Sequence, residues 1–181
     1  GWHVALDTAI NAIGAERMLA LWPTFVVPKT RDWVAQNVTT GELHNVRAAL
    51  RIRPAEEPEL ALNYEFRGAD VRILRTLPNV KQGRGFAAIL GQRHGLMVEE
   101  GHVVAPSGGS VEVADTVMVV PDVRIKPPPA VVKLRTRSQI PAALSLLDQP
   151  PFEFMRKAGQ PTDLAEGWAD ALTVLKLRLA H

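Results

Sequence analysis

The chain has 181 residues, enough for one domain with a sizeable core, and its 46% hydrophobic and 22% charged residues are ordinary for a globular protein. Its 21 basic and 19 acidic side chains leave a formal charge of only +2, which argues against a basic field that would attract nucleic acid. Cysteine is absent, so disulfides and zinc–thiolate sites are excluded.

The first forty residues have a helical pattern. Leu6, Ile10 and Ile13 recur at helical spacing on one face, and a second short helix is expected over 28–37. We therefore predict a helical N-terminal element over residues 1–40. Because the chain opens with glycine rather than methionine, we expect it to be a processed form or a piece of a longer protein.

After Gly41 the hydrophobic period changes from 3.6 to 2, which marks the start of a predicted β domain over 41–181. Residues 43–53 alternate between apolar side chains and a row that includes three arginines, and residues 60–67 alternate in the same way after a proline-bounded loop. Two consecutive strands with one apolar face each predict an antiparallel hairpin. The arginine row is interpreted as a solvated outer face, since no exposed aromatic residues accompany it as they would in a nucleic-acid-binding strand.

Shorter segments complete the predicted β domain. One or two helical turns are expected over 71–77, and a helical insertion near 139–158. Further strands are expected over 85–92, 95–100, 102–106, 110–120, 131–137 and 169–180. The predicted fold class is mainly β (α+β), a curled antiparallel sheet with short helices near both ends.

No pattern of catalytic or metal-ligating residues stands out. The five histidines are scattered, and none has the spacing of a metal site, so no metal and no cofactor are predicted. The Gly83-Arg84-Gly85 sequence precedes a predicted strand rather than a helix, which argues against a phosphate loop. The sequence therefore favours a protein that is not an enzyme.

Several segments occur in a familiar order. These are Trp22-Pro23, Arg31-Asp32-Trp33, Gly41, Tyr64-Glu65-Phe66-Arg67-Gly68, Gly83-Arg84-Gly85-Phe86, Val119-Val120-Pro121-Asp122 and Leu146-Leu147-Asp148-Gln149-Pro150. Their order and spacing resemble the AsmA-like superfamily, in particular YhdP-type, TamB-related envelope proteins, over roughly residues 22–168.

The resemblance implies a segment of a long periplasmic protein that is anchored in the inner membrane of Gram-negative bacteria. Such bridge-like proteins form a curled antiparallel sheet, and its apolar groove is thought to conduct phospholipid to the outer membrane and so to support outer-membrane integrity. Phospholipid acyl chains are then the expected partner, and other envelope proteins are further candidates. Membrane contact is expected only through segments outside this sequence, and no catalytic residue carries over.

The predicted lipid-binding groove consists of the apolar residues of the alternating strands: Leu50, Ile52, Leu62, Tyr64, Phe66, Phe86, Val113, Leu134, Leu175 and Leu177. Two alternatives stay open at this stage. The same alternation is typical of strands that pack on a second layer in an ordinary filled core. The chain could also be an interaction or scaffolding module that assembles envelope proteins through an exposed sheet edge, without binding lipid.

Overall fold

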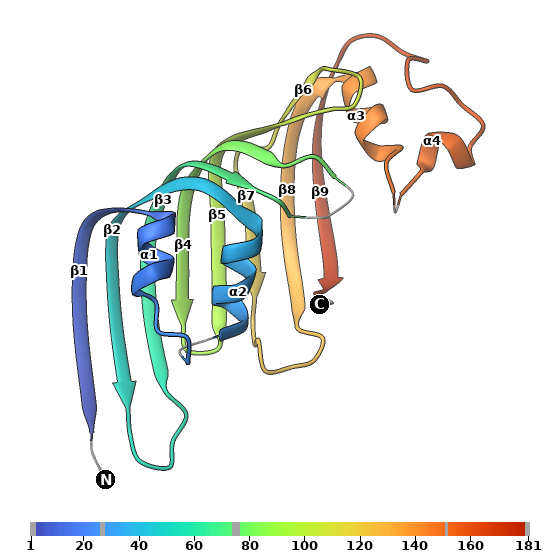
Figure 1. Ribbon diagram of the computed structural model, residues 1–181. Coiled ribbons are helices and arrows are strands. Elements are labelled where there is room, and N and C mark those ends of the chain that lie inside the picture. Colours follow the sequence, from blue (N-terminus) through green and yellow to red (C-terminus); the bar gives the residue numbers. More distant parts are fainter. Residues whose placement is uncertain (1–2, 26–27, 74–76, 151, 180–181) are drawn as a thin grey trace.

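The computed structural model describes residues 3–25, 28–73, 77–150 and 152–179 (Figure 1). It is a mainly β protein with one antiparallel sheet and a few short helices, which confirms the predicted fold class. The helices lie in two groups, before the second strand and before the last. They are α1 (Ala15–Leu21), α2 (Pro28–Asn37), α3 (Ile140–Leu147) and α4 (Phe154–Lys157).

The sheet follows the order of the chain. Each strand pairs antiparallel with the next, except that β6 and β7 share one position between β5 and β8. The strands are β1 (Val4–Gly14), β2 (Val38–Ile52), β3 (Glu59–Val71), β4 (Val80–Leu90), β5 (Arg93–Val104), β6 (Ser110–Glu112), β7 (Thr116–Val120), β8 (Pro129–Gln139) and β9 (Trp168–Arg178). Consecutive pairing of this kind needs only short connections, in agreement with the glycine-punctuated sequence.

The sheet bends where three neighbouring strands carry β-bulges; those of β3 and β4 lie close together, and that of β2 lies lower, opposite Tyr64. The pairing register shifts at Asn45 in β2, at Gly68 in β3 and at Gln82 in β4, and these residues have φ of 52°, 60° and 54°. A bulge adds one residue to its strand and bends it. In Figure 1 the upper ends of these strands arch over α1 and α2, which therefore lie on the concave side of the sheet.

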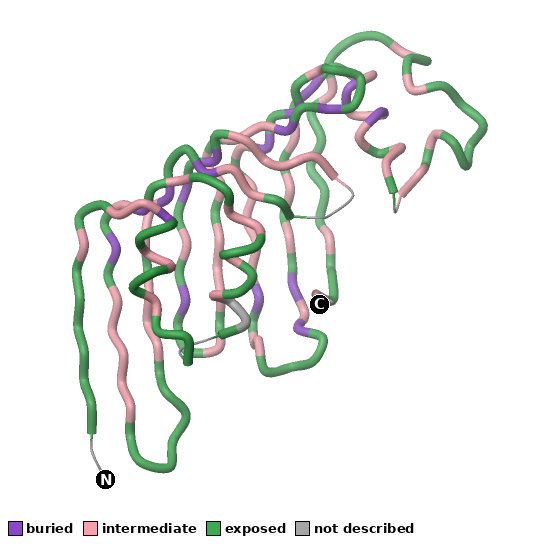
Figure 2. The backbone as a smooth tube through the Cα atoms, viewed as in Figure 1, coloured by how far each residue is buried: buried purple, intermediate pink, exposed green. Residues whose placement is uncertain are grey.

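The main core lies inside this bend. Leu43, Val46, Phe66 and Ala69 are buried together, and Met18 of α1 packs against them. A smaller cluster joins Ala142 of α3 to Ala105 and Val111. Figure 2 shows buried residues along the bend and near α3, and also in the lower parts of β4, β7 and β8, whereas the lower parts of β1, β2, β3 and β9 are intermediate or exposed. The best-packed part of the protein is therefore its upper end.

The N-terminal prediction was wrong in part. Residues 15–21 and 28–37 are helical as expected, but Val4–Gly14 is a strand that pairs with β2 along its whole length, so residues 1–40 are no separate helical element. The spacing of Leu6 and Ile10 fits one face of a helix as well as one face of a strand. The hydrogen bonds and side-chain contacts with β2 favour the strand. Helical turns were expected over 71–77, but Val71 is the last residue of β3. Residues 74–76 of this segment lie outside the described residues.

Candidate functional site

The concave face of the sheet is apolar from one edge to the other. Directly paired residues of antiparallel strands point to the same face, and alternate residues of one strand share a face. The register therefore places one row of side chains across six strands, namely Tyr64, Ala87, Leu96, Met118, Val132 and Leu175. A second row, formed by Leu6, Leu50 and Leu60, extends the face to β1. We call this surface, below the bend, the concave trough.

The trough is open to solvent on its outer strands β1 and β9, whereas on its inner strands Ile89, Val120 and Ala130 are only 8%, 3% and 1% exposed. Leu6 is 53% exposed, Val4 47% and Leu177 41%, and most of the other trough residues are intermediate rather than buried. The helix α1 packs against the upper end through Met18. A sheet packed into a filled sandwich would bury the positions on β1 and β9 as well, so the trough is an apolar surface that is open along its outer strands.

Seven of the ten predicted groove residues lie on the trough: Leu50, Ile52, Leu62, Tyr64, Leu134, Leu175 and Leu177. Two others share its face but are only 9% and 8% exposed. These are Phe66, in the core of the bend, and Val113, beside the backbone of Gly101. Phe86 points to the opposite face, since it pairs with Glu65 and Met97, and it does not belong to the groove.

Sequence reasoning missed the contribution of β1. Val4, Leu6 and Ile10 fall on the trough because they pair with Ile52, Leu50 and Val46. The signal that could have found them is the period-2 alternation of residues 4–10, which competes with the helical spacing of Leu6, Ile10 and Ile13.

The charged side chains of the strands lie on the convex face. Arg51 donates two hydrogen bonds to Asp7, at 2.8 and 3.0 Å, and Arg67 donates one to Glu65 at 3.0 Å. Both pairs are well exposed, so their effect on stability is small. Their value is geometric: with the charges on one face, the other face stays apolar below the bend. The arginine row predicted from residues 43–53 is part of this convex face.

The trough holds only a few polar groups. Burial raises the pKa of the Tyr64 hydroxyl, so it stays neutral. Burial lowers the pKa of the His94 imidazole, whose Nε2 atom is buried without a hydrogen-bond partner. In the described part of the chain, no cluster of three histidine or acidic side chains could hold a metal ion. The trough thus lacks charge, which suits an apolar guest.

His94 makes a pH-dependent contribution to stability. Below the ordinary histidine pKa of about 6.5, His94 binds a proton in the unfolded chain but stays neutral in the folded one. The free energy of unfolding therefore decreases as the pH is lowered, and this group contributes at most about 1.4 kcal/mol per pH unit. We expect His94→Leu to remove that part of the loss between pH 6.5 and 5. Urea unfolding of both proteins across this range is the measurement, and equal slopes would contradict the assignment.

Comparison of this chain with family models, curated proteins and solved structures found no match. Within the described residues, no helix is both long and apolar enough to cross a membrane.

Proposed function

We propose that this chain is a non-enzymatic segment of a periplasmic, inner-membrane-anchored, AsmA-like protein, and that its concave trough carries phospholipid acyl chains toward the outer membrane. The observation that carries the proposal is an uncharged apolar face that extends from β1 to β9 and is open to solvent along its outer strands. The proposal needs no catalytic group and no cofactor.

The energetics favour such a role. Moving an acyl chain into water costs about 0.8 kcal/mol per methylene, or on the order of 12 kcal/mol for sixteen carbons. A continuous apolar surface removes much of that barrier, because the chain exchanges membrane for protein rather than for water.

The dimensions of the trough also suit an acyl chain. The strand segment 46–52 spans about 23 Å at 3.3 Å per residue. This is longer than one leaflet of the hydrocarbon core, which is about 15 Å thick. An acyl chain could therefore lie along the strands without leaving the apolar surface.

Incubation with phospholipid vesicles that contain a fluorescent acyl-labelled phospholipid tests the proposal. After the vesicles are removed by flotation, we expect labelled phospholipid to remain with the protein. The amount retained should fall when unlabelled phospholipid competes for the site. Folded protein that retains no label would count decisively against a lipid-carrying trough.

The sheet edges favour a second candidate, a scaffolding module that assembles envelope proteins. Among the described strands, β1 pairs only with β2 and β9 only with β8, so each has a free edge of eleven residues. Such an edge is a template for an added strand. This candidate predicts that a partner polypeptide slows hydrogen exchange at outward-facing amides of β1 or β9 while no lipid is retained.

A further inference from the structure

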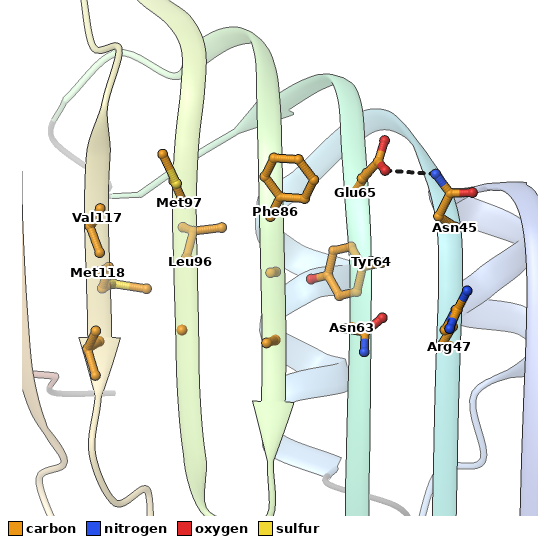
Figure 3. Close-up of a pocket in the computed structure, with 14 residues that line it drawn as sticks. Asn45, Arg47, Asn63, Tyr64, Glu65, Phe86, Leu96, Met97, Val117 and Met118 are labelled. Carbon is orange, nitrogen blue, oxygen red and sulfur yellow. Dashed lines mark hydrogen bonds between the residues drawn. The ribbon is translucent and has the colours of Figure 1, made fainter.

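A second hollow lies on the convex face, away from the concave trough. In Figure 3 the strands run from β7 on the left to β2 on the right, the reverse of their order in Figure 1, so the view is onto the face opposite α1 and α2. The hollow has a volume of about 510 Å³ and spans β2, β3, β4, β5 and β7. We call it the convex hollow. Its size falls within the roughly 300–1,000 Å³ of small-molecule sites.

Small residues form the floor of the convex hollow and larger apolar residues its sides. Ala88 pairs with Gly95, and the next row contains Phe86, Met97 and Val117. Phe86 and Met97 are 44% and 40% exposed, so their apolar surface is available. A Cβ atom built on Gly95 would meet nothing within 4 Å, which shows that the space above it is empty.

Polar side chains line one side only, on β2 and β3. The Arg47 side chain has no ion pair and no hydrogen bond with any described residue, whereas the nearby Arg51 and Arg67 are both paired. Glu65, also on this rim, accepts a hydrogen bond from Asn45 at 2.7 Å (Figure 3). It accepts another from Arg67 at 3.0 Å, and these bonds lower its pKa. The rim therefore offers one cation whose charge is not paired within the part of the chain that the structure describes.

We propose that the convex hollow binds a long-chain carboxylate. The aliphatic tail would lie on Phe86, Met97 and Val117, and the carboxylate would accept paired hydrogen bonds from the Arg47 guanidinium. The planar guanidinium matches a carboxylate in this geometry, and Arg47 is the only basic residue among those that line the hollow. A single tail suits a hollow of this size, while the concave trough is the longer surface proposed for phospholipid.

Titration with oleate and with oleyl alcohol, both below their aggregation concentrations, tests this site on the whole chain. We expect Arg47→Gln to weaken oleate binding about tenfold and to leave oleyl alcohol unchanged, because only the carboxylate needs the cation. Gly95→Leu should fill the hollow and weaken both ligands. Arg53→Gln is the matched control, since Arg53 directly follows β2 but pairs with Glu56 and does not line the hollow.

Circular dichroism and Leu50→Asp separate this proposal from a folding defect and from the concave trough. Each variant should keep the far-UV spectrum of the parent, and Leu50→Asp should leave oleate binding intact. Absence of oleate binding to the parent protein would overturn the proposal. Unchanged oleate affinity in folded Gly95→Leu, or equal losses in Arg47→Gln and Arg53→Gln, would overturn it as well.

Discussion

Replacement of Leu50 by aspartate is expected to lower the phospholipid retained from vesicles about tenfold. Leu50 lies on the concave trough between Leu6 and Leu60, and its side chain is half-buried. An ionised carboxylate there would have to lose water when an acyl chain covers it, and none of the described residues places a cation on this part of the face to compensate. A tenfold loss corresponds to about 1.4 kcal/mol, a modest share of that desolvation cost.

Ala61→Asp is the matched control for this experiment. Ala61 is also half-buried and lies on the adjacent strand, but it pairs with Ala49 and Leu90 on the convex face. Both variants add one carboxylate to the lower part of the sheet, so general effects of charge are common to them. Equal retention by the two folded variants would show that the lipid does not occupy the concave trough.

Gly85→Ala is expected to destabilise the protein by about 3 kcal/mol or more, the upper range of overpacking effects. A Cβ atom on Gly85 would lie 1.9 Å from the carbonyl oxygen of Met97 and 2.8 Å from the ring of Phe66. Neither neighbour can yield easily, because the carbonyl belongs to the β5 backbone and Phe66 is part of the buried core. The melting temperature should fall by on the order of 10 °C.

Gly95→Ala provides the control for that substitution. It makes the same chemical change in the next strand of the sheet, at a position where the new Cβ meets nothing within 4 Å. We expect its stability to equal or slightly exceed that of the parent, since glycine within a strand costs about 0.5–1 kcal/mol. If thermal unfolding showed the two variants to be equally stable, the close approach of β5 to Gly85 would be wrong.

The sequence predicted the middle of the fold well because a strand with one apolar and one polar face shows a clear alternation of residue types. The alternation in residues 43–53 and 60–67 reappears as β2 and β3, and both are longer than predicted at their upper ends. The bulges at Asn45 and Gly68 each add one residue, so that side chains on either side of a bulge no longer alternate between the faces in step. A hydrophobic period of 2 therefore cannot be followed through them.

Strand boundaries were less predictable. One strand, β5, occupies the two segments expected over 95–100 and 102–106, and it passes through Gly101 without a turn. Conversely, the strand expected over 110–120 is interrupted at residues 113–115, where Asp115 has a φ of 54°. Local glycine and valine content does not determine these outcomes, because they depend on which neighbour each backbone group bonds.

The face of Phe86 could not be predicted, since β4 is apolar on both sides. Phe86, Ala88 and Leu90 alternate with Gly85, Ala87 and Ile89, so hydrophobicity alone does not distinguish the two faces. The Phe66 ring packs against Gly85, and this contact determines which residues of β4 face the core and which face the convex side. Such a contact between distant residues is evident only in the three-dimensional structure. It also explains why the convex hollow was missed: Phe86, one of its residues, was expected to face the groove.

Methyl NMR with a phospholipid that carries a nitroxide on its acyl chain is the most direct test of the concave trough. The strands β8 and β9 have methyl groups on both faces, so each strand provides its own control. We expect strong broadening of Leu134, Leu175 and Leu177 and little of Val131, Leu172 and Val174. Broadening that is equal on the two faces, or stronger on the convex face, would contradict the proposal that acyl chains lie in the trough.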